Sequence, residues 1–137
     1  MNNERKNSKK RQAILDALQN TVEHPNAEML YRQLKDSIPS LSLATVYRNL
    51  NMLADDGMIV SVGEVNGQER FDGRTDEHAH FVCRKCFRVF DIALPEALAD
   101  SCAASAGEQG FAVESRTVRL NGLCPRCREQ SGDEQVY

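Results

Sequence analysis

The chain has 137 residues, of which 41% are hydrophobic and 27% charged, a composition typical of one ordinary globular domain or two small ones. No apolar run approaches the ~20 residues that a membrane span requires. The first residues, MNNERKNSKK, also lack the apolar segment of a signal peptide. We therefore expect a cytoplasmic protein with reduced cysteines and no membrane partner.

The net charge of −3 is unevenly distributed along the chain. Residues 1–50 carry eight Lys and Arg against five acidic residues, whereas residues 51–137 carry nine against fifteen. A basic N-terminal part on an acidic body is typical of an N-terminal nucleic-acid reader. The signal is weak by itself, since many solvated surfaces differ as much.

Three helices are predicted in the first part of the chain, after a disordered segment at residues 1–7. The expected helices cover residues 8–20, 27–38 and 43–56. Ser8, Asn26 and Ser42 are their N-caps, and Gly57 closes the third helix in the left-handed conformation. Apolar residues recur at helical spacing in each segment, so the three helices are expected to share one core.

After the third helix the apolar residues alternate, as they do in β-strands. Residues 58–65 and 68–72 flank Asn66-Gly67, the strongest short signal for a hairpin. Three helices followed by a hairpin predict a winged helix, whose third helix would read bases in the major groove. The predicted base contacts are Ser42, Thr45, Tyr47 and Arg48, and the predicted phosphate contacts are Lys9, Lys10 and Arg11. The alternative is a small helical domain with an ordinary polar face.

The second part of the chain predicts a small α+β unit after a polar hinge. Strands are expected over residues 78–86, 87–94 and 111–124, with a helix from Pro95 to about Gln109 between the last two. Cys102 shares a helical face with Leu94 and Leu98, so we expect it to be a buried small residue. Phe81, Val82 and Phe111 are expected to help form the core. A small core and an exposed strand edge favour dimerisation of this unit.

Four of the five cysteines form two CxxC pairs, Cys83-Arg-Lys-Cys86 and Cys124-Pro-Arg-Cys127. Each pair lets two thiolates of one tight turn point at the same ion, so two pairs supply the four ligands of a structural zinc (Zn2+) site. The long gap between the pairs means that the ion would join segments far apart in the sequence. A pair of disulfides or two redox motifs is the alternative.

A second candidate site combines nitrogen and oxygen ligands. His78 and His80 stand two residues apart, so on a strand their side chains would project to the same face. The upstream His24 and the flanking Asp72 and Asp91 complete a set of three imidazoles and two carboxylates. Such a set suits Fe(II), Mn(II) or Zn(II) rather than Cu(I). The alternative is loop histidines beside ordinary surface aspartates.

Several segments together resemble the ferric uptake regulator (Fur) family. They are His24-Pro25-Asn26-Ala27, SLATVYRNL from Ser42 to Leu50, RFD from Arg70 to Asp72, HAHFVCRKC from His78 to Cys86, and CPRC from Cys124 to Cys127. The resemblance covers the chain apart from its two tails. It implies an N-terminal winged-helix DNA-binding domain followed by a small α/β dimerisation domain with a four-cysteine zinc site. It also implies a homodimer that binds a palindromic operator in double-stranded DNA when it carries its regulatory metal.

Within this family the chain is most similar to the peroxide-sensing branch, whose regulatory Fe2+ or Mn2+ is held by three histidines and two aspartates. His24, Asp72, His78, His80 and Asp91 occupy the matching positions. Iron-uptake regulators usually carry Glu where Asp91 stands, so Asp91 is the discriminating residue. The resemblance further implies that peroxide oxidises an Fe(II) ligand, His24 or His78, and that this oxidation lifts repression.

The sequence therefore predicts an α+β protein with a winged-helix domain at residues 1–72, a hinge at 73–77, and a dimerisation and metal-binding domain at 78–137. A metal bound by ligands of both domains would hold them in one orientation. The expected function is a metal-dependent repressor of peroxide-defence genes and not an enzyme. The alternatives are an iron- or zinc-uptake repressor that senses metal occupancy alone and, more distantly, a metal-dependent redox enzyme.

Overall fold

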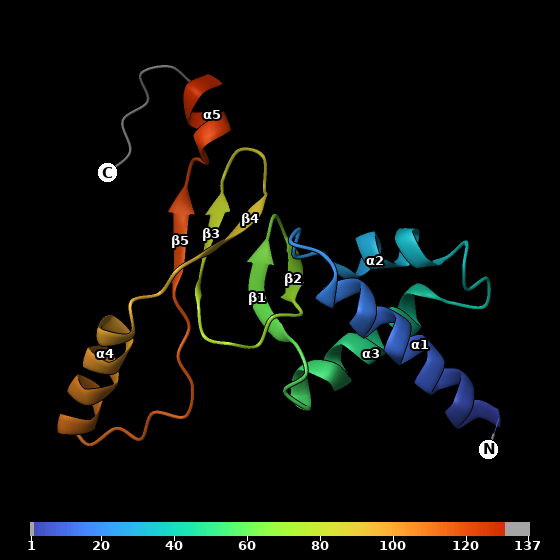
Figure 1. Ribbon diagram of the computed structural model, residues 1–137, viewed down its shortest axis with the longest axis horizontal. Helices are drawn as coiled ribbons and strands as arrows, with labels where there is room; N and C mark the ends of the chain where they lie inside the picture. Colours follow the sequence, from blue (N-terminus) through green and yellow to red (C-terminus); the bar gives the residue numbers. More distant parts are fainter. Residues whose placement is uncertain (1, 131–137) are drawn as a thin grey trace. The chain divides into compact units, whose positions relative to one another are not determined.

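The computed structural model describes the backbone of residues 2–130 and the side chains from Ser8 onward. The chain divides into two compact units, Met1–Thr75 and Asp76–Tyr137, which we call the N-terminal and the C-terminal unit (Figure 1). Residue 1 and residues 131–137, at the outer ends of the two predicted domains, lie outside the described residues. None of the helices in the described part is both long and apolar enough to cross a membrane.

The N-terminal unit begins with three helices, α1 (Asn2–Gln19), α2 (Ala27–Leu34) and α3 (Leu43–Asp55). The predicted caps of the last two are confirmed, because Asn26 Oδ1 accepts from Met29 N at 2.8 Å and Ser42 Oγ accepts from Thr45 N at 3.1 Å. The prediction of Ser8 as a cap was wrong, since α1 already starts at Asn2. The segment before Ser8 contains no Gly or Pro, so nothing in it prevents the helix from extending.

Apolar faces of these helices meet in one core. It also receives Leu41 and Ile59 from the loops that flank α3. The residues buried in this core are Ile14, Leu15, Leu18, Ala27, Leu30, Leu41, Val46, Leu50, Leu53, Ile59 and Phe71. The predicted helical stripes are therefore confirmed, and α2 and α3 are held in place by burial of the residues that the spacing indicated.

A two-stranded antiparallel hairpin, β1 (Val60–Val65) and β2 (Gln68–Asp72), follows α3. Asn66 and Gly67 at its tip have φ of 53° and 82°. Two left-handed residues in succession are the requirement of a type I′ turn, which explains the Asn-Gly pair. The register shifts between Ser61 and Gly63, so β1 contains a bulge near the middle of the hairpin.

The C-terminal unit is built on a three-stranded sheet in the order β4-β3-β5 (Figure 1). Its strands are β3 (Ala79–Cys83), β4 (Val89–Ile92) and β5 (Arg119–Gly122). Strand β3 is central, pairing antiparallel with β4 and parallel with β5. Two helices complete the unit, α4 (Glu96–Glu108) before β5 and α5 (Pro125–Gln130) after it.

Several predictions for this unit were wrong. The last strand is only four residues long, and residues 111–118 have no regular structure. The second CxxC pair lies in and just before α5, a helix that the sequence reading missed. Cys102 and Phe111 are exposed instead of buried. The physical reason is that α4 buries only Ala99, so its remaining apolar side chains have no core to enter within one chain.

Gly73, directly after β2, is required by a close approach of the backbone to α1. A Cβ at this position would stand 2.7 Å from both C and O of Leu18 and 2.8 Å from Gln19 N. We expect Gly73→Ala to lower the free energy of unfolding by about 1–3 kcal/mol, because backbone atoms must shift to admit the methyl group. Urea unfolding followed by circular dichroism measures this change.

Gly107 in α4 is the matched control, because a Cβ there would meet nothing within 4 Å. Gly107→Ala should be neutral or stabilise the helix by up to ~1 kcal/mol. If Gly73→Ala also leaves the free energy of unfolding unchanged, the prediction is contradicted, and the end of β2 can move away from α1 at little cost.

Candidate metal centres

The first candidate centre gathers four thiols within the C-terminal unit. One ligand atom from each of Cys83, Cys86, Cys124 and Cys127 lies within 4.8 Å of the others. The parallel pairing of β3 with β5 explains this convergence, because Cys83 is the register partner of Gly122 and the second CxxC pair begins two residues later. Two knuckles that are far apart in sequence therefore meet at one end of the sheet.

The spacing of the sulfur atoms fits a tetrahedral ion. Cys86 Sγ and Cys124 Sγ are 3.8 Å apart. A tetrahedral zinc ion with Zn–S bonds of about 2.3 Å has sulfurs about 3.8 Å apart, whereas a disulfide bond is about 2.05 Å long. All five cysteines are free thiols. The cluster could therefore hold zinc, and the disulfide alternative has no support in this geometry.

The thiols differ in their acidity. Burial raises the pKa of Cys83, but N–H groups of Cys86, Cys124 and Lys85 donate to its sulfur and lower the pKa to about 6. Burial raises the pKa of Cys127 to about 12, and hydrogen bonds with the neighbouring thiols act in the same direction. Without a cation the cluster therefore holds protons that a bound metal would displace, and metal affinity should fall as the pH falls.

The N-terminal unit holds two members of the second predicted set of metal ligands, His24 and Asp72. Both side chains are buried, and His24 Nε2 lies 3.2 Å from Asp72 Oδ2. The backbone N–H of Arg74 donates to Asp72 Oδ1 at 2.8 Å, which orients the carboxylate. An imidazole nitrogen and a carboxylate oxygen thus converge, as they would on a divalent metal.

His24 adopts an unusual backbone conformation, with φ of 54°. The left-handed region costs a residue with a Cβ about 1–2 kcal/mol, so the surrounding structure has to stabilise it. Hydrogen bonds from β2 hold this segment. Arg70 Nε donates to His24 O, and Phe71 N donates to Pro25 O at 3.0 Å. The position of His24 is therefore set by β2.

The C-terminal unit contributes His78, His80 and Asp91. Asp91 on β4 is the register partner of His80 on β3, and His78 stands directly before β3. Asp91 Oδ1 is 2.7 Å from His78 Nε2 and 3.5 Å from His80 Nε2. The two imidazole rings lie 4.5 Å apart between centroids. The predicted common face of the two histidines is thereby confirmed.

The backbone also selects which nitrogen of His78 faces the carboxylate. His78 Nδ1 lies 2.7 Å from Asp76 O, and a carbonyl oxygen can only accept a hydrogen bond. Nδ1 therefore carries a proton, and Nε2 faces the Asp91 carboxylate at 2.7 Å, a separation that requires a proton or a metal ion between the two atoms. This arrangement is typical of metal-ligating histidines, whose second nitrogen donates to a carbonyl or carboxylate.

The predicted DNA contacts are distributed unevenly around α3. Tyr47 is 46% exposed, and Arg48 is exposed on the same helix. Ser42 and Thr45 are joined to each other in the N-cap, with their side-chain oxygens 2.8 Å apart. Tyr47 and Arg48 are therefore exposed without a role in the cap, whereas the exposed Ser42 is engaged with Thr45.

The basic residues of α1 are partly engaged within the unit. Lys9 is exposed, Lys10 Nζ donates to Ser40 O at 3.4 Å, and Arg11 Nε donates to Asn49 Oδ1 at 3.4 Å. Sequence reasoning missed the role of Asn49, a buried polar residue in α3 whose Nδ2 donates to Thr45 O at 2.9 Å. It also missed Arg70, since a strand that alternates would expose one of two neighbouring residues, and both Arg70 and Phe71 are buried.

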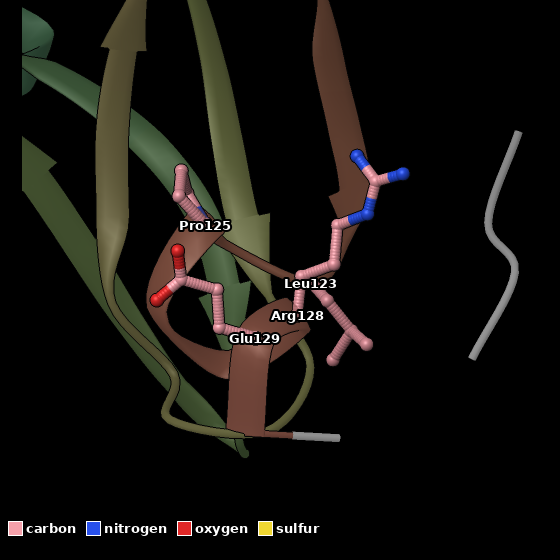
Figure 2. A pocket seen from close by; sticks show the side chains of 4 residues that line it. All are labelled: Leu123, Pro125, Arg128 and Glu129. Carbon is pink, nitrogen blue, oxygen red and sulfur yellow. The ribbon is translucent and has the colours of Figure 1, made fainter. Parts of the chain in front are cut away.

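A shallow depression of about 480 Å³ lies beside the second cysteine knuckle (Figure 2). It is lined by Leu123, Pro125, Arg128 and Glu129. The side chains are an apolar pair and an oppositely charged pair. Neither pair includes a metal-ligand histidine or a nucleophile, so this depression adds no chemistry to the two candidate centres.

Comparison with known proteins identifies the family of this chain. Residues 2–121 match the model of the ferric uptake regulator family. The chain is 32% identical over 120 residues to the peroxide operon regulator of Bacillus subtilis, a match that covers 88% of this chain and 82% of that protein. The chain therefore belongs to the ferric uptake regulator family, and as a member it is a transcriptional regulator and not an enzyme.

Solved structures of this family share the fold. The peroxide stress regulator of Campylobacter jejuni superposes with a TM-score of 0.78 and 34% identity, covering 92% of this chain and 94% of that one. A zinc uptake regulator solved in complex with zinc and DNA superposes with a TM-score of 0.70 and 25% identity, covering 88% and 82%. The α+β fold with an N-terminal winged helix is thus common to this chain and to its relatives.

The thiol cluster makes a prediction that distinguishes the five cysteines. We expect Cys124→Ser to abolish stoichiometric zinc and to lower the melting temperature of the C-terminal unit, because a structural metal contributes its binding energy to folding. Metal analysis after gel filtration, together with a thermal scan, measures both effects. Cys102→Ser is the matched control, since this exposed thiol lies outside the cluster. Equal zinc content in both variants would contradict the assignment.

Proposed function

We propose that this regulator is a metal-dependent repressor that senses hydrogen peroxide through oxidation of a histidine ligand. Its structural zinc would be held by the four clustered cysteines. Its regulatory Fe2+ or Mn2+ would be held by His24, Asp72, His78, His80 and Asp91. The observation that carries the proposal is the Asp91 carboxylate, which has the Nε2 atoms of two histidines within 2.7 and 3.5 Å.

The chemistry of the donor set supports this choice of metal. Imidazole nitrogens and carboxylate oxygens suit Fe(II) and Mn(II), and no thiol competes for these positions, since the four knuckle cysteines form their own cluster. The similarity to the peroxide operon regulator of Bacillus subtilis and to the peroxide stress regulator of Campylobacter jejuni favours peroxide as the signal. The short Asp91 side chain is consistent with that branch of the family.

The regulatory metal would couple peroxide to DNA by joining ligands of both units. His24 and Asp72 belong to the N-terminal unit, whereas His78, His80 and Asp91 belong to the C-terminal unit. A site completed only when the units adopt one orientation binds metal best in that orientation, so the metal shifts the population toward it. In a homodimer this orientation would set the distance between two α3 helices, which a palindromic operator requires to be about 34–36 Å.

Bound Fe(II) would activate hydrogen peroxide by lending it an electron, which the imidazole ring returns to the iron as the ring is oxidised. Overall, the peroxide gives one oxygen atom to an imidazole ring and leaves as water, and the ring becomes 2-oxo-histidine. His24 and His78 are the expected targets. The oxidised ring is a poor ligand, so the metal would be lost and repression would end. The oxidised protein would not return to its starting state, so it would act as a sensor and not as a catalyst. We place this sensor in the cytoplasm.

The test is a peptide mass measurement after an oxidation that depends on the metal. Protein loaded anaerobically with Fe(II) receives a small dose of hydrogen peroxide, and protein loaded with Mn(II) is treated in parallel. We expect one added oxygen on the peptide of His24 or of His78 in the Fe(II) sample alone. The exposed residues Met52 and Met58 serve as internal controls for general oxidation.

A different result would favour the other function. Oxygen on the methionines but on no histidine, together with DNA release by a chelator, would identify a repressor that senses metal occupancy alone. Oxygen on the histidines in both metal samples would show that the modification does not depend on Fe(II).

DNA recognition by α3 is tested on sequences that the protein itself selects. A pool of random duplexes is enriched with Mn(II)-loaded protein, and the selected site is then used in titrations. We expect Arg48→Ala to weaken binding to this site by about 1–3 kcal/mol, the range for an arginine that contacts a base. Arg32→Ala on α2, where the side chain is 77% exposed, should leave the affinity unchanged. Equal affinities for both variants, or a selected site without two-fold symmetry, would contradict the proposed mode.

A further inference from the structure

Arg70 in β2 is a buried arginine, so contact with DNA does not explain its position. Arg70 is 8% exposed, and its guanidinium faces the segment that carries His24. Nε donates to His24 O, and Nη2 donates to Glu23 O at 2.8 Å. The planar guanidinium thus spans two successive carbonyl groups, which a lysine with a single ammonium group would not reproduce.

Arg70 belongs to a row of three consecutive contacts. Phe71 N donates to Pro25 O at 3.0 Å, and Asp72 Oδ2 lies 3.2 Å from His24 Nε2. Three neighbouring residues at the end of β2 therefore contact residues 23–25. The row orients both the backbone of His24 and its ring.

The bulge in β1 lies opposite this row. In a regular strand, neighbouring side chains point to opposite faces, but all three residues from Arg70 to Asp72 are buried. The register shift between Ser61 and Gly63 lies opposite Arg70 and Phe71. The extra residue bends and twists the hairpin locally at the level of this row.

We propose that Arg70 is the positioning residue for His24, holding its backbone in the left-handed conformation from which the ring reaches the regulatory metal. This inference rests on the proposed function insofar as His24 is a metal ligand. The guanidinium does not contact the metal itself. It acts through two carbonyl groups. Its removal should therefore change the position of His24 Nε2 and leave the number of metal ligands unchanged.

The charge of Arg70 fits this role. Burial lowers the pKa of Arg70, and the negative charge of Glu23 raises it again. An arginine remains protonated well above neutral pH even when its pKa falls, so the donors stay available over the working range. Hydrogen bonds from a charged donor are also stronger than those between neutral groups.

A double-mutant cycle separates positioning from general stabilisation. The chain is prepared as Arg70→Met, His24→Ala and the combination, and Mn(II) affinity is measured by calorimetry on the full-length protein. We expect Arg70→Met to weaken Mn(II) binding about 10- to 100-fold, as removal of groups that orient a ligand does. In the His24→Ala background the same substitution should change the affinity less than about two-fold, because the ligand that Arg70 orients is already gone.

A second readout needs no metal. The chain has three histidines, so the ring signals in a hydrogen–nitrogen correlation spectrum can be assigned with single variants. In the metal-free protein, Arg70→Met should shift or broaden the ring signals of His24 and leave those of His78 and His80 unchanged. Arg32→Met is the control for loss of an exposed arginine and should change none of them.

These outcomes decide separate questions. An equal loss of Mn(II) affinity with and without His24, or an unchanged His24 ring spectrum, would overturn the positioning role. If His24→Ala alone leaves Mn(II) affinity unchanged, the proposed ligand set is wrong, and the metal-free spectrum still decides the role of Arg70. If Arg70→Met does not fold, Arg70→Lys takes its place, and we expect it to keep the fold but to disturb the His24 ring.

Discussion

The register of strand β3 determines both candidate sites of the C-terminal unit. On one side it pairs His80 with Asp91 of β4, and on the other it pairs Cys83 with Gly122 of β5. The thiol cluster and the histidine pair lie near opposite ends of one short strand. Because side chains alternate along a strand, a slip of one residue would turn His78 and His80 away from Asp91 and separate the two cysteine knuckles. An ion bound by the four thiols would prevent such a slip, and in this way a structural metal would also preserve the other site.

The N-terminal unit depends on a comparable constraint at the end of β2. Here His24 and Asp72 come from a loop and a strand that are far apart in sequence, and hydrogen bonds from the Arg70 side chain and the Phe71 backbone N–H connect these segments. Gly73 then allows β2 to end against α1 without a clash. Phe71 also belongs to the hydrophobic core formed by helices α1, α2 and α3, so this core helps to hold the end of β2 in place. A histidine in a strained backbone conformation is thus held by a well-packed scaffold, an arrangement that a precise metal site requires.

Sequence patterns predicted those features that arise from local chemistry. The caps Asn26 and Ser42, the Asn-Gly turn and the two CxxC knuckles each have a direct physical cause within a few residues. What the patterns missed depends on tertiary structure. Cys102 was expected to be buried because it shares a helical face with Leu98, but spacing shows only that residues share a face and not that a partner covers it. The buried Arg70 was invisible for a similar reason, because its carbonyl acceptors lie more than forty residues away.

The division of the histidine and aspartate ligands between two units has a thermodynamic consequence for the proposed function. Each unit alone presents two or three ligands, and such a partial set binds a divalent metal weakly. All five ligands would be available only in orientations of the two units that bring them together. The metal would therefore bind those orientations more tightly than the others and shift the population toward them. Loss of a single ligand then lowers the affinity for the metal and the preference for one orientation at the same time. This linkage explains how one oxygen atom on one imidazole ring would be sufficient to change the affinity for DNA, and why the geometry of His24 matters more than its burial alone.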